Sequence, residues 1–205
     1  MCRDPSIVSL FQGTGGVHLK SKPRRTGSVM PMGYVVRFPD EADADAIGSV
    51  HSRAWRAAYS GGLMPDEDLD RLSPEVRADM WRPRLTQLVA DRSARLVVED
   101  PDGVVVGFAR IGPEEHDDAA AGGELYAINV DPDSWGTGAG RALHAFALDA
   151  LRDSGFERAV LWVHPENRRA RHFYEALGWR ADDVERIAVL QGIDVPEVRY
   201  SLNLI

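Results

Sequence analysis

A glycine-rich segment in the middle of the chain has the residue types and spacing needed to bind a phosphate group. It reads Ile-Asn-Val-Asp-Pro-Asp-Ser-Trp-Gly-Thr-Gly-Ala-Gly-Arg over residues 128–141, at the point where a predicted strand gives way to a helix. Glycine has no side chain to block approach, and the first N–H groups of a helix lie unpaired at the positive end of its dipole. We therefore expect an anion cradle that suits a phosphate or pyrophosphate.

Two common nucleotide-binding motifs fit this segment poorly. A dinucleotide-binding fingerprint requires glycine at the position of Arg141, and a P-loop requires Lys followed by Ser or Thr after the last glycine. Arg141 and Ala142 satisfy neither motif. The structural alternative is a turn that needs glycine for its backbone conformation alone.

The segment resembles the Q/R-x-x-G-x-G/A motif of the GCN5-related N-acetyltransferase (GNAT) superfamily, which holds the pyrophosphate of acetyl-CoA. The glycines match, whereas Trp135 stands where the motif has Gln or Arg. A second block, from Asn167 through Tyr174 to Trp179, resembles the family pattern N-x-x-A-x-x-F/Y-Y-x-x-x-G-F/W. The resemblance covers roughly residues 34–204 and is strongest over 124–179. It implies an α/β GNAT fold, with helices on both faces of a mixed sheet of about six to seven strands, and acetyl-CoA as co-substrate.

The resemblance also implies where acetyl-CoA binds. The pantetheine arm is expected along the main chain of Ile128, Asn129 and Val130, where an N–H group would stabilise the oxyanion. Asn167 matches a family asparagine near the same arm, and it fits a helix N-cap equally well. The pyrophosphate is expected on the main chain of Gly136, Thr137, Gly138, Ala139, Gly140 and Arg141.

Acetyl transfer to an amine needs a proton acceptor and a proton donor. An alkyl amine with a pKa of about 10.4 is almost entirely protonated at neutral pH, so a base or a water relay must remove a proton. The departing thiolate leaves more easily if a phenol, with a pKa of about 10, donates to it. Tyr174 matches the phenolic acid of the family. The alternative is that Tyr174, on the inner stripe of a predicted helix, belongs only to the core.

Glu124 is the main candidate for the base. Its position matches the strand glutamate that serves as base in the histone-acetylating branch of the superfamily, and a half-buried glutamate can have a raised pKa. The alternative is a solvated residue at the end of a strand. His164 is a second candidate, and Trp162 stands where some members carry a base on the following strand.

An acceptor pocket is predicted from two aromatic residues and an acidic loop. Trp55 and Tyr59 lie one turn apart on a predicted helix, and Glu115 belongs to a loop that also contains Glu114, Asp117 and Asp118. These carboxylates would attract a cationic amine. The alternatives are that the two aromatic residues lie in the core and that the loop is simply solvated.

Hydrophobic periodicity predicts the elements that must position these residues. Strands are predicted at 34–38, 96–98, 104–111, 124–130, 158–163 and 198–204, and helices at 40–58, 65–72, 74–89, 138–154 and 167–177. The segment 112–123 is predicted to be a loop. Within 65–89 the residues expected to face inward are Leu72, Val76, Met80 and Leu88.

Length and composition favour a globular domain. The chain has 205 residues, 44% of them hydrophobic and 27% charged, and it contains no apolar run long enough to span a bilayer. The net charge of −8 argues against nucleic acid as a partner. The one cysteine, Cys2, permits no internal disulfide, which agrees with a cytoplasmic protein. No metal site and no membrane contact are expected, whereas a homodimer stays open.

Residues 1–31 differ in composition from the rest of the chain. The basic residues Arg3, Lys20, Lys22, Arg24 and Arg25 are opposed there only by Asp4. We predict a disordered tail, or an incorrectly assigned start with Met30 or Met32 as the first residue, followed by an acetyltransferase domain over 32–205. A basic arm for nucleic acid is the functional alternative.

Three functions therefore stay open at the level of sequence. The first is an acetyltransferase that uses acetyl-CoA and a primary amine of a small molecule or peptide, by direct attack within a ternary complex. The second is a catalytically idle sensor of acyl-CoA with the same fold. The third is a nucleotide-binding regulatory domain of different topology.

Overall fold

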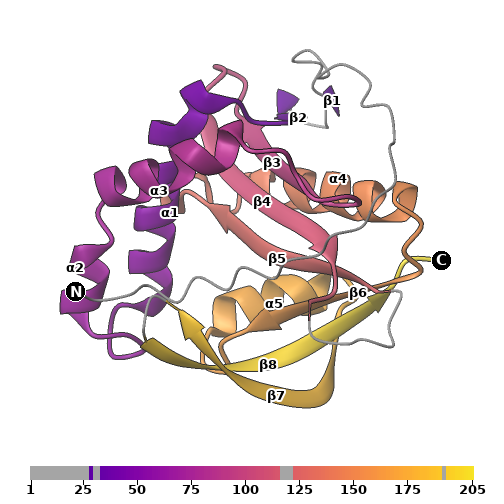
Figure 1. Ribbon diagram of the computed structural model, residues 1–205. Coiled ribbons are helices and arrows are strands. Elements are labelled where there is room, and N and C mark those ends of the chain that lie inside the picture. Colours follow the sequence, from indigo (N-terminus) through magenta and orange to yellow (C-terminus); the bar gives the residue numbers. More distant parts are fainter. Residues whose placement is uncertain (1–27, 30–32, 116–121, 191–192) are drawn as a thin grey trace, which may run out of the picture.

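Apolar runs that lack helical periodicity form the strands of one mixed sheet. The computed structural model describes residues 28–29, 33–115, 122–190 and 193–205 (Figure 1). The strand order is β1-β2-β3-β4-β5-β6-β8-β7, and every neighbouring pair is antiparallel except β5 and β6. The strands are β1 Ser28–Val29, β2 Val35–Arg37, β3 Ala94–Glu99, β4 Val105–Pro113, β5 Gly123–Val130, β6 Arg158–Val163, β7 Arg180–Leu190 and β8 Ile193–Asn203.

In the described residues, five α-helices connect and cover these strands, and glycine follows three of them. Gly61, Gly155 and Gly178 follow the ends of α1, α4 and α5 with φ values of 85°, 79° and 92°, a left-handed conformation that glycine adopts without strain. The helices are α1 Ala44–Tyr59, α2 Asp66–Arg71, α3 Pro74–Thr86, α4 Ala139–Asp153 and α5 Arg168–Ala176, with short 3-10 turns η2 Glu41–Asp43 and η3 Pro132–Ser134.

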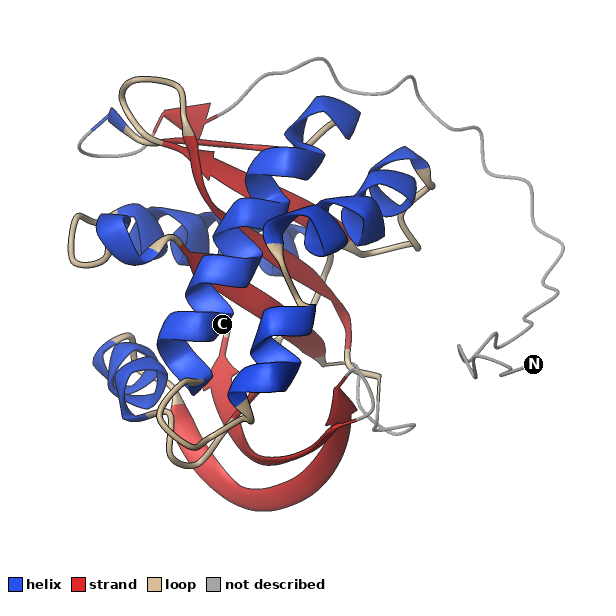
Figure 2. Cartoon of the chain, turned by 90° about the vertical axis from the view of Figure 1, so that its left-hand side faces the viewer, coloured by secondary structure: helices blue, strands red, loops and turns tan. Residues whose placement is uncertain are grey.

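Helices pack on both faces of the sheet, as predicted (Figures 1 and 2). On one face, Ile47 of α1 and Trp81 of α3 pack against Phe108 of β4. On the other face, Leu143 of α4 and Tyr174 of α5 join a larger apolar cluster that includes buried residues of β3, β4, β5 and β6. We call these the α1 face and the α4 face. The mixed α/β architecture is therefore confirmed.

The two parallel strands at the centre of the sheet diverge. β5 and β6 are paired only at Gly123 with Ala159 and at Glu124 with Val160, although β5 continues to Val130. The register between β5 and β4 also shifts near Arg110, so that β5 has one extra residue there. A bulge of this kind bends the strand that carries it. The edge of β5 that faces β6 is consequently unpaired by β6 over most of its length.

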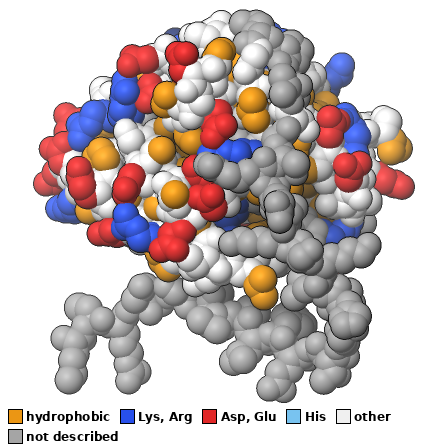
Figure 3. All heavy atoms as spheres, turned by 90° about the horizontal axis from the view of Figure 1, so that it is seen from above, with side chains coloured by type: hydrophobic (Ala, Val, Ile, Leu, Met, Phe, Trp, Pro, Cys, Tyr) orange, Lys and Arg blue, Asp and Glu red, His pale blue; other side chains and the backbone are white. Residues whose placement is uncertain are grey.

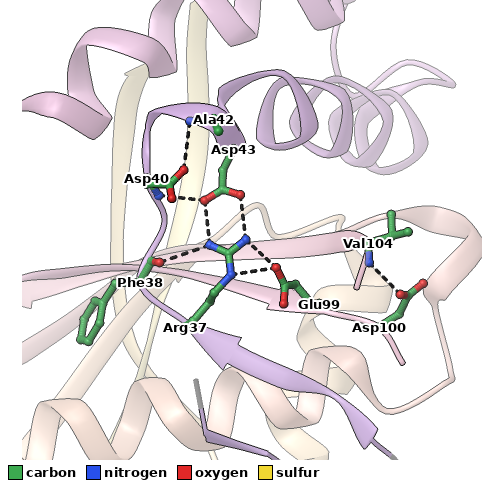
Figure 4. A network of polar contacts seen from close by, with 8 residues as sticks. All are labelled: Arg37, Phe38, Asp40, Ala42, Asp43, Glu99, Asp100 and Val104. Carbon is green, nitrogen blue, oxygen red and sulfur yellow. Dashed lines mark hydrogen bonds and ion pairs between the residues drawn. The ribbon is translucent and has the colours of Figure 1, made fainter. Parts of the chain in front are cut away.

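A buried ion-pair network surrounds Arg37 of β2 (Figure 4). Arg37 of β2 is only 4% exposed, and its guanidinium donates to both carboxylate oxygens of Asp43 at 2.7 and 2.8 Å. It also donates to Glu99 of β3 through Nε at 2.7 Å. These carboxylates raise the pKa of Arg37, so the guanidinium stays charged. The network joins β2 and β3 to the turn that precedes α1.

The predicted pattern of inward residues in α3 is wrong in part. Val76 is 49% exposed and Leu88 is 80% exposed, because Leu88 lies beyond the end of the helix at Thr86. The buried side chains of α3 are instead Arg77, Ala78, Trp81 and Leu85. A buried arginine on the inner stripe cannot be recognised as such by hydrophobic periodicity.

Several other predictions differ from the structure at their boundaries. The 112–123 segment, predicted as a loop, contains the end of β4 and the start of β5, and residues 116–121 lie outside the described residues. Strand β7 was not predicted, and β8 begins at Ile193 rather than Val198. Within the predicted basic tail, Ser28 and Val29 form β1. The other residues of that tail, 1–27, 30 and 31, lie outside the described residues.

Two surface properties bear on partners. Among the described helices, none has the length and hydrophobicity required to cross a membrane. Acidic and basic side chains are intermixed on the face seen from above in Figure 3. Ion pairs such as Arg82 with Asp45 and Asp79 contribute to such mixing.

Candidate active site

The glycine-rich turn between β5 and α4 has the geometry of an anion cradle. Gly136 and Gly138 have φ values of 78° and 104°, a region that other residues rarely adopt, and Gly138 is the N-cap of α4. Within the part of the chain that the structure describes, no protein acceptor takes the main-chain N–H of Gly138, Ala139, Gly140 or Arg141. These four donors are therefore available to an anion at the positive end of the helix.

Neighbouring side chains hold this turn in place. Tyr34 donates to Thr137 Oγ1 at 2.6 Å, and Thr137 donates in turn to the Ser134 carbonyl at 2.7 Å. Arg53 of α1 forms ion pairs with Asp131 and Asp133 at the start of the turn. The side chain of Thr137 is thus engaged within the protein, which leaves its main chain for any ligand.

Two glycines in this region have different roles. A Cβ on Gly136 would meet no heavy atom within 4 Å, so glycine is needed there for its conformation. A Cβ on Gly140 would lie 3.5 Å from the ring of Phe173, an ordinary van der Waals contact, so packing against α5 does not by itself require glycine there. Ala139, between them, is fully buried and anchors the first turn of α4 in the core.

Trp135, which departs from the resembling motif, makes two contacts of its own. Its Nε1 donates to the Val130 carbonyl at 2.8 Å, and the Arg169 guanidinium lies 3.8 Å from the centroid of its ring. The Val130 carbonyl is therefore already bonded, whereas Ile128 and Asn129 continue the β5 edge that β6 leaves unpaired. Sequence reasoning missed Arg169, because a stack between sequence-distant residues leaves no signal in spacing.

Asn167 is the N-cap of α5. Its Oδ1 accepts from the Ala170 N–H at 3.1 Å, as the structural alternative predicted. This cap fixes the first turn of the helix that carries Tyr174.

Tyr174 lies in an aromatic cluster on the α4 face of the sheet. It is 8% exposed, and its ring packs against Phe173, Trp179 and Tyr200. Burial, with a smaller contribution from Tyr59, raises the pKa of Tyr174 above its ordinary value. The hydroxyl has no hydrogen-bond partner among the described residues, and its oxygen is not completely enclosed. Tyr174 is therefore a neutral phenol whose proton is available.

Glu124 is a buried carboxyl group on the other face. It lies opposite Gly112 of β4, which shares the α1 face with Phe108, and it is 4% exposed. Burial raises the pKa of Glu124 to about 7, although an N–H bond from Glu115 at 3.2 Å and the charge of Arg186 act in the opposite direction. A carboxyl group with such a pKa can accept a proton near neutral pH.

The structure gives the acidic loop and His164 specific partners. The Glu114 carboxylate is 1% exposed and pairs with Arg158 at 2.8 Å and Arg199 at 3.2 Å, so the prediction of a solvated or cation-attracting Glu114 is wrong. Glu115 is exposed, and Asp117 and Asp118 lie outside the described residues. His164 is buried, and its Nδ1 accepts from the Glu166 N–H.

The predicted acceptor residues Trp55 and Tyr59 do lie together, with ring centroids 5.2 Å apart. The ring centroids of Tyr59 and His164 lie 6.2 Å apart. Burial raises the pKa of Tyr59 to about 12. Tyr59 contributes to the raised pKa of Tyr174. The hydroxyl groups of Tyr59 on α1 and Tyr174 on α5 therefore lie near each other. No contact among the described residues joins Glu124 directly to Tyr174. Glu124 lies on the α1 face, whereas Tyr174 belongs to the apolar cluster of the α4 face.

Comparison with known proteins decides the family. The model of the acetyltransferase (GNAT) family matches residues 53–179, more than half of the chain. The chain belongs to the acetyltransferase (GNAT) family. The matched residues contain the whole glycine-rich turn, Glu124 and Tyr174, so the family resemblance seen in the two sequence motifs is confirmed.

Curated relatives cover part of this GNAT chain. It is 34% identical to mycothiol acetyltransferase of Cellulomonas flavigena over 159 aligned residues, which cover 76% of this chain and 43% of that protein. It is also 34% identical over 132 residues to the uncharacterized N-acetyltransferase YuaI of Bacillus subtilis, covering 64% of this chain and 72% of YuaI. The chain thus spans less than half of the mycothiol acetyltransferase it matches.

Solved structures share the GNAT fold. The ribosomal-protein-S5-alanine acetyltransferase of Vibrio fischeri has a TM-score of 0.64 at 18% identity, covering 87% of this chain and 96% of that one. The PaiA N-acetyltransferase of Thermoplasma acidophilum, solved in complex with coenzyme A, has a TM-score of 0.58 at 18% identity and covers 84% and 99%. At these identities the likeness concerns the fold.

Proposed function

We propose that this GNAT chain is an N-acetyltransferase that transfers the acetyl group of acetyl-CoA to an amine. The observation that carries the proposal is the set of free N–H groups from Gly138 to Arg141 at the start of α4, next to the unpaired edge of β5. The pyrophosphate binds these donors, and the pantetheine arm lies along Ile128 and Asn129, which directs the thioester toward Tyr174. Membership of the GNAT family and the acetyltransferase names of its relatives support the same reaction.

The chemical roles follow from the protonation states of two side chains. The amine nitrogen attacks the thioester carbonyl carbon, and Glu124, directly or through a water molecule, accepts the proton that the nitrogen loses. The C–S bond then breaks, and Tyr174 donates its proton to the departing thiolate of CoA. A carboxyl group with a pKa near 7 and a phenol with a raised pKa suit these two tasks at neutral pH.

The acceptor belongs to the α1 face. Trp55 and Tyr59 line the approach to Tyr174 from that face, and Glu115 lies at the rim beside Glu124. We infer a primary amine of a small molecule or peptide that attacks directly within a ternary complex, in a cytoplasmic protein. Because the chain covers only 43% of mycothiol acetyltransferase, this relative does not fix the acceptor, and a wider panel of amines is tested.

The test is a turnover screen with acetyl-CoA and detection of the free thiol. Small-molecule amines, amino acids and short peptides are offered as acceptors, and calorimetry with CoA, ATP and NAD is run in parallel. We expect micromolar binding of CoA alone and thiol release with at least one class of amine. Binding of CoA without turnover across the panel would instead support an idle sensor, and tighter binding of ATP or NAD would contradict the cradle assignment.

A further inference from the structure

An arginine of α5 stacks on the tryptophan that begins the glycine-rich turn. The guanidinium carbon of Arg169 lies 3.8 Å from the centroid of the Trp135 ring, and Trp135 directly precedes Gly136. The Trp135 side chain is half-buried, and its Nε1 donates to the Val130 carbonyl at 2.8 Å, which fixes the ring beside the end of β5. The stack therefore holds a cation against the residue that leads into the turn.

A second contact places the same face of α5 against the other end of the turn. Phe173 follows Arg169 by four residues, a spacing that puts both side chains on one face of the helix. A Cβ on Gly140 would lie 3.5 Å from the Phe173 ring, and the ring centroids of Phe173 and His144 lie 6.0 Å apart. One face of α5 thus contacts Trp135 and the start of α4, the two segments that flank the free N–H group of Gly138 in the sequence.

The charge of Arg169 is available to a ligand. Its side chain is exposed, and its guanidinium forms no ion pair and no hydrogen bond within the described part of the chain. Arg171 on the same helix differs, because it donates to the Tyr200 hydroxyl and to the Pro165 carbonyl. Residues 134–140 contain no cationic side chain of their own. Arg169 therefore brings to this segment a positive charge that its own sequence lacks.

We propose that Arg169 binds the diphosphate of acetyl-CoA from α5, with the Trp135 ring as the platform that orients its guanidinium. This inference rests on the proposed acetyltransferase function and adds a cofactor-binding residue outside the glycine-rich turn. Stacking fixes the plane of the guanidinium and leaves the N–H groups at its edge free, and two of them can donate in parallel to phosphate oxygens. Because α5 also carries Tyr174, one helix then holds both the diphosphate and the proton donor for the thiolate.

Three ligands test which phosphate Arg169 contacts. CoA carries the diphosphate and a 3′-phosphate, dephospho-CoA keeps the diphosphate alone, and pantetheine has neither group. We expect Arg169→Gln to weaken binding of CoA and of dephospho-CoA by the same factor, about tenfold or more, because a charge-assisted hydrogen bond is lost. Binding of pantetheine should stay unchanged. Calorimetry measures the first two affinities directly and the third by competition with CoA.

The outcomes of this titration separate the new inference from the function on which it rests. A loss confined to CoA would assign Arg169 to the 3′-phosphate, and equal affinities of wild type and Arg169→Gln would remove it from the site. Either result overturns the role of Arg169 and leaves the acetyltransferase function intact. Failure of the wild type to bind CoA would instead contradict the cradle itself.

Arg168→Gln is the matched control. Arg168 is the exposed neighbour of Arg169 on α5, and in the described ranges its guanidinium has no hydrogen bond, ion pair or aromatic contact. The substitution changes the charge of the helix by the same amount, so it should leave the affinities for CoA and dephospho-CoA nearly unchanged. Equal losses in Arg168→Gln and Arg169→Gln would mean that the net charge of α5 attracts the cofactor, which would contradict a specific role for the stacked guanidinium.

Combined substitutions test Trp135 as the platform. Trp135→Leu removes the ring, and we expect it to lower CoA affinity in the wild type but to have little further effect in Arg169→Gln, since the ring acts through the arginine. Additive losses would contradict this role. Arg169→Lys keeps the charge without the planar stack and should bind CoA more weakly than the wild type, so equal affinity would also count against the platform. Unfolding midpoints without CoA report on the fold, and if Trp135→Leu does not fold, Arg169→Lys decides alone.

Discussion

The chemistry proposed for this chain depends on two side chains whose pKa values are both raised by burial. Tyr174 and Glu124 both have raised pKa values, but the consequences differ because one group must keep its proton and the other must lose it. A raised pKa keeps the phenol neutral throughout the physiological range. A carboxyl group with a pKa near 7 is about half ionised at neutral pH and is far more basic than an ordinary glutamate.

Replacement of Tyr174 by phenylalanine should lower kcat while the affinity for CoA stays unchanged. The ring remains in its aromatic cluster, and only the proton donor is lost, which for general acid catalysis costs about 10²–10⁴-fold. Assays of thiol release measure kcat, and calorimetry with CoA measures the affinity for CoA. Tyr200→Phe, a neighbouring ring 6.5 Å away, is the matched control and should keep nearly full turnover. Unchanged kcat in Tyr174→Phe would remove this residue from the mechanism.

Activity should rise with pH as Glu124 loses its proton. Below the pKa of about 7 the carboxyl group is protonated and cannot accept a proton, so kcat/KM should increase through pH 7 and then level off until other groups titrate. In Glu124→Gln the inflection near pH 7 should disappear, and the rate at higher pH should fall by about 10²-fold or more. A wild-type inflection that persists in the glutamine variant would assign the titration to another group.

At the scale of elements, the turn between β5 and α4 makes a prediction about binding. Gly138→Ala forces a side chain into a left-handed conformation, which costs about 1–2 kcal/mol and distorts the N–H donors at the start of α4. Loss of one charge-assisted hydrogen bond is worth about 1.5–3 kcal/mol, so CoA affinity should fall about tenfold or more.

Gly155→Ala provides the control for this substitution. Gly155 has a φ of 79° at the other end of α4, far in sequence from the turn, and a Cβ there would have only one neighbour, at 3.8 Å. Gly155→Ala should lower the unfolding midpoint about as much as Gly138→Ala does, without changing the affinity for CoA. If both variants bound CoA equally well, the cradle would not depend on the conformation of Gly138.

The elements that position the site were predictable because each has a local signature. Strand β6 matches its predicted bounds, and α4 and α5 begin and end within a residue or two of theirs, since Gly138, Asn167 and Gly155 mark the boundaries. Strand β7 was missed because its apolar residues do not face the core. Ile187 and Val189 are 64% and 68% exposed, and Asp183 has a positive φ where the register with β8 shifts. Such a strand is held by backbone pairing, which leaves no hydrophobic alternation.

The candidate site was predictable only where residues follow one another in sequence. The glycine-rich turn and the α5 block were found because both are local motifs. The buried Arg77 beside Trp55 was not, because α3 and α1 bring these two residues together only in the folded chain. The same is true of the stack between Arg169 and Trp135.

At the scale of the whole molecule, stability in mild acid should depend on groups with opposite effects. Burial lowers the pKa of His144 from 6.5 to about 4, and it also lowers that of His51. Their contribution to stability is present above pH 6.5 and is lost as pH falls toward 4. Glu124 acts in the opposite direction, because its raised pKa gives a contribution that is lost as pH rises from 4.5 through 7.

We therefore expect Glu124→Gln to lose stability on acidification more steeply than the wild type. Between pH 6.5 and 4.5 the wild-type glutamate offsets part of the loss from the two histidines, whereas glutamine cannot. Urea unfolding at several pH values measures the slope of the unfolding free energy in both proteins. Identical slopes would mean that the Glu124 carboxyl group titrates alike in the folded and unfolded chains.

The early divergence of β5 from β6 has a kinetic consequence. Had this parallel pair remained hydrogen-bonded to its end, the sheet would have been a continuous barrier between its two faces. Because pairing stops after Glu124 and Val160, we expect the thioester of the proposed reaction to reach the reaction centre from the α4 side while the amine arrives from the α1 side. Neither molecule has to pass the other, so arrival of the two reactants and departure of the two products need no obligatory order.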